Sequence, residues 1–191
     1  MDKLKGKDGV PIDLAPAQPA SQLDDPCPWV NLDDEGSGLT VDHFLTTMVS
    51  QVINGLRRTV TLPYAEAFGV TVPEWRLLSL LAYAKSLPFA ELVVQSTSDK
   101  AQVSRTVRRL EAQGLVAIHA EGSTPRKKLT CAITPAGQAF HEKVIPIARQ
   151  RQAAMIRLLT PEEREVTYRA LKKLHAHCMA MPENGNTPAD E

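Results

Sequence analysis

The sequence has few cysteines, no long apolar run and no net charge. Its 191 residues include three cysteines, Cys27, Cys131 and Cys178, whose wide separation predicts neither a disulfide framework nor a zinc knuckle. The longest nearly apolar run, residues 77–84, is far shorter than the ~20 apolar residues that cross a bilayer. Residues 1–30 lack the apolar core of a secretory signal. We therefore expect a soluble cytoplasmic protein without a membrane partner.

The charges balance overall but are unevenly distributed. Lysine plus arginine and aspartate plus glutamate each number 22. Residues 1–40 contain eight acids and three lysines, whereas residues 96–130 contain seven bases and three acids. A polyanion responds to the local field rather than to the total charge, so the zero net charge does not exclude nucleic acid as a partner.

The first half of the chain has two stretches with a helical period. Apolar residues recur every three or four positions over residues 41–56, which predicts a long helix that ends before Pro63. The segment 71–74, Thr-Val-Pro-Glu, has the form of a capping box. It predicts a second helix that continues to about Tyr83.

Shorter elements follow in the middle of the chain. Residues 86–88 are expected to open a short third helix, and Ser98 or Asp99 to cap a fourth helix that ends at Gly114 with a left-handed cap. Two short β runs then surround a basic loop and predict a hairpin. These runs are residues 116–120 and 129–133.

The end of the chain predicts two more helices. One begins at Thr134 and is expected to bend at Pro146, which cannot donate to the preceding turn. The other begins at a second capping box, residues 160–163. The terminal segments 1–38 and 182–191 show no period, and we expect both to be flexible tails.

Residues 86–134 have the order of a winged helix-turn-helix. A short helix, a polar turn, a second helix and a basic hairpin follow one another. On the second helix the apolar stripe of Val103, Val107 and Leu110 is expected to face the core. We predict that the opposite face contacts DNA through polar and basic side chains. These are Lys100, Gln102, Ser104, Arg105, Thr106 and Arg109.

These side-chain types suit a DNA groove. Arginine and glutamine form bidentate hydrogen bonds with base edges, and short hydroxyls fit phosphates. The hairpin tip is expected to reach a neighbouring minor groove, whose negative potential attracts Arg126, Lys127 and Lys128. The alternative is that these cations are ordinary solvated surface. The order of the polar turn, the apolar stripe and the basic hairpin favours DNA contacts over an ordinary solvated surface.

The segment 92–137 resembles the winged helix-turn-helix of the MarR family of transcriptional regulators. It reads LVVQSTSDKAQVSRTVRRLEAQGLVAIHAEGSTPRKKLTCAITPAG. DKAQVSRTVRRLEAQGLV matches the recognition helix, LTCAITPAG the strand-to-helix junction, and the preceding VTVPEWRLLSLLA the second helix of the family. In the wing the family usually has Asp-x-Arg, whose arginine enters the minor groove, where this chain has Pro125, Arg126 and Lys127.

The resemblance implies a mainly α-helical fold with a small β-hairpin wing and long dimerisation helices. The winged helix-turn-helix occupies residues 71–133, and a helical dimerisation region occupies residues 39–70 and 134–181. The family forms homodimers on double-stranded DNA, which implies a pseudo-palindromic operator with half-sites about 10 bp apart. Apolar stripes on the last two helices independently favour a partner subunit. The alternative is that these helices pack only within the monomer.

The resemblance also implies a repressor that a small aromatic acid releases from DNA. Aromatic walls beside a guanidinium suit a hydroxybenzoate-like carboxylate. The candidate contacts are His43, Arg57, Arg58, Tyr64, Trp75 and Arg76. The alternatives are core packing for Trp75, solvent exposure for Arg57 and Arg58, and a place in the dimer seam for His43.

A thiol switch is a competing hypothesis. Asp24 and Asp25 lie near Cys27, and carboxylates raise a thiol pKa, which opposes thiolate reactivity. Cys131 and Cys178 are expected to be small core residues. A ligand-independent DNA-architectural protein is a further alternative.

An enzyme is the hypothesis from another class. The sequence shows no glycine-rich phosphate loop, no Ser-His-acid arrangement and no metal-ligand spacing. We therefore expect no catalytic activity, no metal and no cofactor.

Overall fold

The computed structural model describes residues 27–96, 98–121 and 128–180. The chain divides into two compact units, Met1–Arg151 and Gln152–Glu191, and each is described by itself. Within those three ranges, none of the helices combines the length and the apolarity that a membrane span needs.

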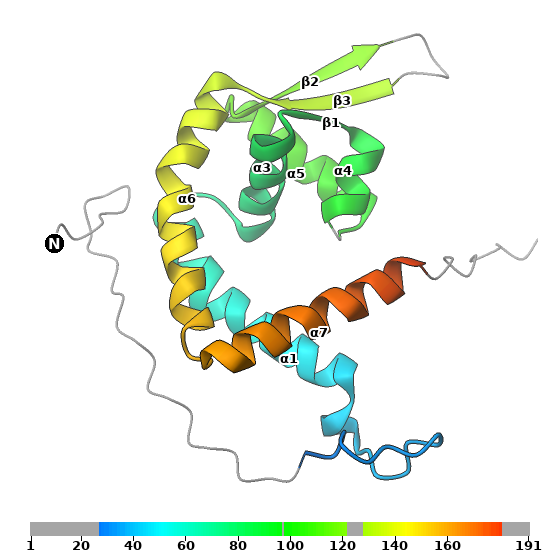
Figure 1. The fold of residues 1–191 in the computed structure, drawn as a ribbon. Coiled ribbons are helices and arrows are strands. Elements are labelled where there is room, and N and C mark those ends of the chain that lie inside the picture. The colour runs from blue at the N-terminus through cyan, green and yellow to red at the C-terminus, as the bar shows by residue number, and fades with distance from the viewer. Residues whose placement is uncertain (1–26, 97, 122–127, 181–191) are drawn as a thin grey trace, which may run out of the picture. The chain divides into compact units, whose positions relative to one another are not determined.

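The architecture is mainly helical, with one small antiparallel sheet, as the sequence predicts. A 3₁₀ turn η1, a π-helical turn η2, seven α-helices and three strands follow one another among the described residues. In chain order they are η1 (Val41–His43), α1 (Leu45–Leu56), η2 (Arg57–Thr61), α2 (Leu62–Ala67), α3 (Val72–Ala84), β1 (Ser86–Pro88), α4 (Phe89–Ser96), α5 (Lys100–Ala112), β2 (Val116–Glu121), β3 (Lys128–Ile133), α6 (Pro135–Ile156) and α7 (Pro161–Ala180) (Figure 1).

Helix α1 ends at Leu56, before Pro63 as predicted, but the backbone does not leave the helical conformation there. It continues through η2 into α2, where Pro63 lies in the first turn. In η2 the Leu62 N–H donates to the carbonyl of Arg57, five residues back. The π turn thus starts a new hydrogen-bond ladder at α2, and the first N–H groups of a ladder need no acceptor within the helix. Pro63, which has no N–H, is tolerated there.

The segment 86–88 forms strand β1 and does not open a helix, which corrects the sequence prediction. Helix α4 begins at Phe89. The strand pairs antiparallel with β3, Leu87 opposite Cys131, and the sheet order is β1-β3-β2. Leu87 is buried, and Pro88 is tolerated because β1 lies at the sheet edge.

Several predicted helix boundaries are confirmed. The Thr71 N–H donates to the Glu74 carboxylate at 2.7 Å, and the Glu74 N–H donates to Thr71 Oγ1 at 3.3 Å, which completes the capping box of α3. Thr160 and Glu163 form the same reciprocal pair at the start of α7. Gly114 has φ of 71°, the left-handed conformation expected after α5.

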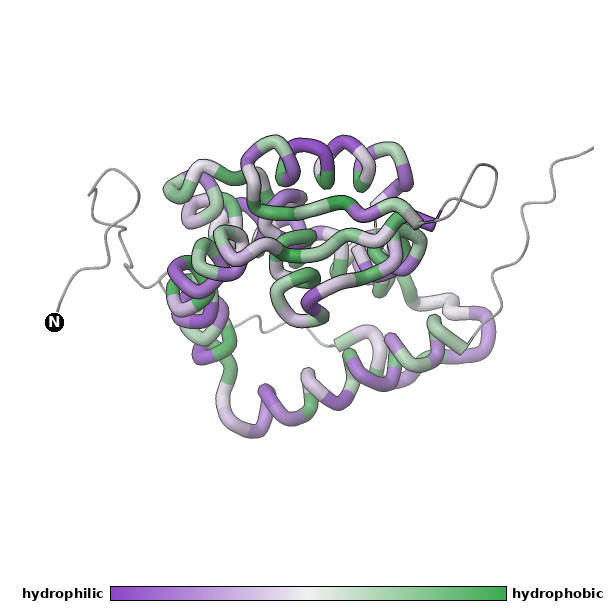
Figure 2. Tube along the Cα trace, turned by 90° about the horizontal axis from the view of Figure 1, so that it is seen from above, coloured by the Kyte–Doolittle hydropathy of each residue, from purple (hydrophilic) through white to green (hydrophobic). Residues whose placement is uncertain are grey.

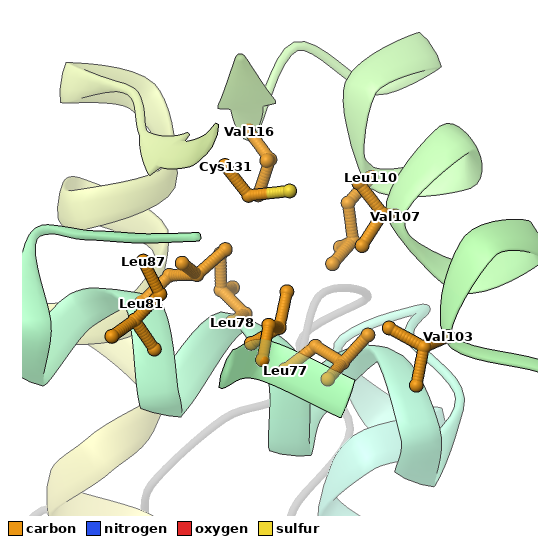
Figure 3. Packing of buried hydrophobic residues seen from close by; sticks show 10 residues of the cluster. Leu77, Leu78, Leu81, Leu87, Val103, Val107, Leu110, Val116 and Cys131 are labelled. Carbon is orange, nitrogen blue, oxygen red and sulfur yellow. The ribbon is translucent and has the colours of Figure 1, made fainter. Parts of the chain in front are cut away.

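The core of the winged helix-turn-helix lies between the sheet and helices α3, α4 and α5. Val103 and Val107 are 1% exposed and Leu110 is 0% exposed, so the predicted stripe is confirmed. Hydrophobic and hydrophilic residues alternate along the helices, which leaves one side of α5 polar (Figure 2). The labelled cluster in Figure 3 consists of Leu77, Leu78, Leu81, Leu87, Val103, Val107, Leu110, Val116 and Cys131.

The junction between the sheet and α6 is fixed by Thr134 and Gly137. Thr134 Oγ1 donates to the carbonyl of Gly114 at 2.7 Å, and the Thr134 N–H donates to the carbonyl of Leu115 at 3.1 Å. The Gly137 N–H donates back to Thr134 Oγ1 at 3.0 Å. A Cβ at Gly137 would overlap the Leu115 carbonyl, so this close approach requires glycine.

Aromatic contacts tie helix α6 to α3 and to Phe68, the residue that follows α2. The imidazole of His141 stacks on Trp75, with centroids 5.4 Å apart and an interplanar angle of 14°. Phe140 meets Phe68 edge to face at 6.3 Å. These contacts hold the helix-turn-helix against the first half of α6.

Helix α7, in the second unit, has no buried residue. Cys178 is exposed there, which corrects the prediction that it is a core residue, because its own unit provides nothing to cover it. Cys131 is buried as predicted, and Cys27 is exposed.

Candidate nucleic-acid interface

Asp99 fixes where helix α5 begins. Its Oδ1 accepts from the Gln102 N–H at 2.8 Å, as an N-cap side chain does. The Ser98 hydroxyl instead donates to the carbonyl of Ser96 at 3.3 Å. Of the two predicted caps, Asp99 therefore starts α5, and this start sets which side chains face outward.

The outward side of α5 is strongly basic. Lys100, Arg105, Arg108 and Arg109 are exposed, and Ser104 is half-buried beside them. At ~100° per residue, Arg105 and Arg108 lie closest to the direction opposite the buried stripe. We define this group of four exposed cations as the basic face. Arg108 is not among the predicted DNA contacts, although its spacing of three from Arg105 indicates the same side of the helix.

Thr106 does not lie on the basic face, which corrects the sequence prediction. It is 7% exposed, and its Oγ1 donates to the carbonyl of Gln102 at 2.8 Å. The reason is helical phase, because Thr106 follows Val103 by three positions and precedes Leu110 by four. Gln102 is half-buried on the same flank of the helix.

The wing is a hairpin of β2 and β3. The register pairs Val116 with Ile133 at the base and Glu121 with Lys128 at the outer end. Lys128 is exposed there. The other two predicted wing contacts, Arg126 and Lys127, lie outside the described residues.

A pocket of about 200 Å³ lies on the flank of α5, and we name it the α5 pocket. It brings together two of the predicted ligand contacts, Arg57 from η2 and Arg76 from α3. Apolar side chains of α3 and α5 complete its wall. Its polar lining consists of Arg57, Arg76, Ser96, Ser98, Gln102 and Thr106.

A second, more open hollow of about 330 Å³ lies along the outer side of α3, and we name it the α3 groove. It brings Trp75 and Arg76 together with Tyr83, which the sequence analysis did not select. Arg76 lines both the α5 pocket and the α3 groove. The groove therefore combines aromatic side chains with a guanidinium.

The remaining predicted ligand contacts lie elsewhere. Tyr64 is 2% exposed and meets Trp75 edge to face at 5.8 Å. Burial raises the pKa of the Tyr64 phenol. His43 contacts Thr40 Oγ1 through Nδ1 at 3.1 Å, and neither His43 nor Arg58 lines the pocket or the groove.

His141 was not found by sequence reasoning. Burial, with the positive charges of Arg149 and Lys85, lowers the pKa of its imidazole, and Glu142 opposes that shift. The stacking partner of His141 is Trp75, which also lines the α3 groove.

The thiols and the metal-ligating side chains form no reactive cluster in the part of the chain that is described. Burial, and to a lesser extent Glu111, raises the pKa of the Cys131 thiol, which disfavours the reactive thiolate. The described residues contain no group of three or more histidine, cysteine, aspartate or glutamate side chains that could hold a metal ion.

Known proteins show the same combination of elements. The sequence profile of the MarR family matches residues 68–124. The HTH-type transcriptional repressor Rv2887 of Mycobacterium tuberculosis is 32% identical over 138 residues, which cover 72% of this chain and 97% of that protein.

Two solved structures share the fold. NadR in complex with 4-hydroxyphenylacetate has a TM-score of 0.61 at 22% identity, covering 75% of this chain and 98% of NadR. A mutant MarR from E. coli in complex with operator DNA has a TM-score of 0.61 at 20% identity, covering 68% of this chain and 92% of that one. Together with the identity to the mycobacterial repressor, these findings show that the chain belongs to the MarR family of transcriptional regulators.

Proposed function

We propose that the chain is a sequence-specific repressor that binds a pseudo-palindromic operator as a homodimer and is released by a small aromatic carboxylate. The observation that carries the DNA-binding part is the basic face, whose three arginines lie opposite a fully buried apolar stripe on a capped helix. Action on chromosomal DNA requires a cytoplasmic location. Neither a cofactor nor a catalytic step is part of the proposal.

The basic face supports contacts of two kinds. Arg105 and Arg108 point most directly away from the core, and we assign them to base edges in the major groove. Flanking side chains contact the backbone phosphates. These are Lys100, Gln102, Ser104 and Arg109. On the wing, Lys128, together with Arg126 and Lys127, is assigned to the adjacent minor groove.

Exposed apolar side chains support the homodimer. Neither α1 nor α7 has a buried residue within its own unit. Surface patches of this kind mark interaction sites in soluble proteins. On α1 they are Leu45, Met48, Val49, Val52 and Ile53, and on α7 they are Val166, Tyr168, Leu171, Leu174 and Met179. We therefore assign dimerisation to residues 39–70 and 134–181, and DNA binding to residues 71–133.

The α3 groove supports the aromatic effector. Its lining pairs the Arg76 guanidinium, which binds a carboxylate as a fork, with Trp75 and the 93% exposed Tyr83. NadR, which shares the fold, was solved with 4-hydroxyphenylacetate, itself a small aromatic acid. The protein exchanges between a conformation that fits the operator and one that does not. A ligand that binds the second conformation more tightly shifts the population toward it, and the DNA is released.

An aromatic acid is expected both to stabilise the protein and to release the operator. At a concentration of 100 times its dissociation constant it raises the free energy of unfolding by about 2.7 kcal/mol. The measurement is thermal melting and fluorescence anisotropy with benzoate, salicylate, 4-hydroxybenzoate and 4-hydroxyphenylacetate.

The Tyr83→Ala variant should lose most of the stabilisation and operator release by the aromatic acid, because the substitution removes an exposed wall of the α3 groove without opening the core. Val94→Ala is the matched control, since Val94 is 77% exposed on α4 and lies outside the groove. If none of the four acids changes the melting temperature or the affinity for the operator, the result would favour a ligand-independent architectural protein.

A further inference from the structure

We infer that the segment before α1 packs on helix α7 of a second copy of the chain in the dimer. The segment comprises residues 27–44, and we name it the N-terminal arm (blue in Figure 1). The inference rests on the proposed homodimer. It extends the dimerisation region from residue 39 back to residue 27 and names the surface of the partner subunit that the arm contacts.

The N-terminal arm has no core of its own. The structure describes every residue from 27 to 59, and none of them is buried. Within the arm, the large apolar side chains are exposed. They are Trp29, Val30, Leu32, Val41 and Phe44. Exposed apolar side chains in this number mark a protein–protein contact surface.

Hydrogen bonds hold the arm in a defined conformation. The Trp29 indole donates from Nε1 to the carbonyl of His43 at 2.7 Å, which joins the two ends of the arm. Between them, the Ser37 N–H donates to Asp33 Oδ1 at 2.8 Å, in a turn where Gly36 has φ of 66°. A segment that is already held in this way loses less conformational entropy on binding than a free chain does, so more of the contact energy is left for affinity.

The arm continues directly into the apolar side of α1. Phe44 immediately precedes the helix, and residues 45–56 contain no charged side chain. The exposed apolar residues of α1 recur every three or four positions, so they share one side of the helix. Because we assign that side to the dimer interface, the arm lies at the edge of the same interface.

The charge of the arm indicates a basic partner surface. Residues 27–44 contain four acids and no lysine or arginine. Asp34, Glu35 and Asp42 are exposed, and none of them forms an ion pair among the described residues. These three carboxylates are therefore left to attract the cations of another surface.

Helix α7 has the matching combination of basic and apolar side chains. Residues 169–180 contain three bases and no acid. Lys172 and Lys173 are exposed, and neither is in an ion pair within the described part of the chain. Leu171 and Leu174 are exposed next to them in the sequence. Complementary charges attract the two surfaces, and they also fix the register in which the apolar side chains meet.

Helix α5 is the other basic surface, and it fits the arm less well. It has four exposed cations, but none of its large apolar side chains is exposed. The apolar side chains of the arm would stay uncovered there. Helix α7 has no buried residue in its own unit and needs a cover as well. We therefore assign the arm to α7 of the partner subunit, and in a twofold dimer this contact occurs twice.

Reversal of the charges tests the contact. The arm-reversed variant carries Asp34→Lys and Glu35→Lys, and the α7-reversed variant carries Lys172→Glu and Lys173→Glu. Each should raise the dissociation constant of the dimer by about tenfold or more at low salt, because repulsion replaces attraction at both symmetric contacts. Sedimentation velocity over a concentration series measures that constant. All four side chains are exposed, so the fold of each subunit should be unchanged, which circular dichroism checks.

The matched control reverses two exposed acids of the same unit outside the arm. Glu91→Lys combined with Glu111→Lys makes the same change in net charge as the arm-reversed variant. The control should dimerise nearly as well as the unaltered protein. An arm-reversed protein that dimerises as well as this control would overturn the inference and leave the proposed homodimer standing.

A mixture of the two reversed variants distinguishes a second copy from the arm's own chain. In the heterodimer, the reversed arm faces the reversed α7, and the unaltered arm faces the unaltered α7. Both contacts are attractive again, so the mixture should recover nearly the dimer affinity of the unaltered protein. If the arm contacted α7 of its own chain, the repulsion would persist in the mixture, and that result would overturn the inference.

Trp29→Ala tests the apolar part of the arm. The substitution removes the indole and its hydrogen bond to His43. It should weaken the dimer by about tenfold or more, since a tryptophan covered by a partner is often among the strongest contributors to an interface. Val94→Ala is the control, because Val94 is an exposed apolar residue of the same unit on α4. Equal dimer affinities for these two variants would contradict the inference, whereas a monomeric unaltered protein would contradict the proposed homodimer as well.

Discussion

Replacing Arg105 and Arg108 together with alanine is expected to weaken operator binding by about 2 kcal/mol or more, since a base-contacting arginine contributes ~1–3 kcal/mol. Both side chains are exposed on the basic face, so the free energy of unfolding should change little. Discrimination between operator and unrelated DNA should fall with the affinity, because base contacts carry specificity. Fluorescence anisotropy at several salt concentrations measures both quantities.

The matched control for this double variant removes two exposed arginines of the same unit from outside α5. Arg58→Ala combined with Arg149→Ala makes the same change in net charge without touching the basic face. The control should lose only the weak, sequence-independent attraction of the lost charges. Equal losses in the two double variants would remove α5 from the interface.

Gly137→Ala is expected to lower the free energy of unfolding by about 3 kcal/mol, at the upper end of the cost of overpacking. A Cβ there would overlap the backbone carbonyl of Leu115, which is also bonded to Thr134. The Cβ would also crowd the Ile133 side chain, but the overlap with the Leu115 carbonyl is with backbone, which cannot turn aside as a flexible side chain can. For a protein of this size the melting temperature should fall by about 6–12 °C.

Gly55→Ala is the control for Gly137→Ala. Gly55 lies within α1, and a Cβ there meets nothing within 4 Å. Alanine is the better helix former by roughly 0.5–1 kcal/mol, so this variant should melt at the same temperature or higher. A Gly137→Ala protein as stable as Gly55→Ala would show that the junction between the sheet and α6 can relax.

Features that depend on neighbours in sequence were predictable. The capping box of Thr71 and Glu74, the cap at Asp99 and the left-handed Gly114 each need residues within four positions, and each is present. The buried stripe of α5 followed from spacing alone. Thr106 was assigned wrongly because its hydroxyl suggested DNA, although the same spacing placed it beside Val103.

Features that depend on distant partners were not predictable from local patterns. Strand β1 exists because Leu87 pairs with Cys131, more than forty residues later in the sequence. The π turn η2 reflects a shift in the backbone ladder around Pro63, which no side-chain period reports. The α5 pocket needs η2, α3, α4 and α5 together, so the selection of Arg57 and Arg76 as ligand contacts could not specify its location.

In the proposed complex, two copies of α5 read successive major-groove faces on one side of a duplex. The most direct measurement compares a selected operator with the same operator carrying five extra base pairs between its half-sites, and determines the number of chains bound. Half a helical turn places the half-sites on opposite faces, so we predict two chains per operator and a loss of about 100-fold or more in affinity on insertion. A duplex of equal length with the insertion outside the half-sites should bind normally. One chain per duplex, or an affinity that the central insertion leaves unchanged, would contradict the account.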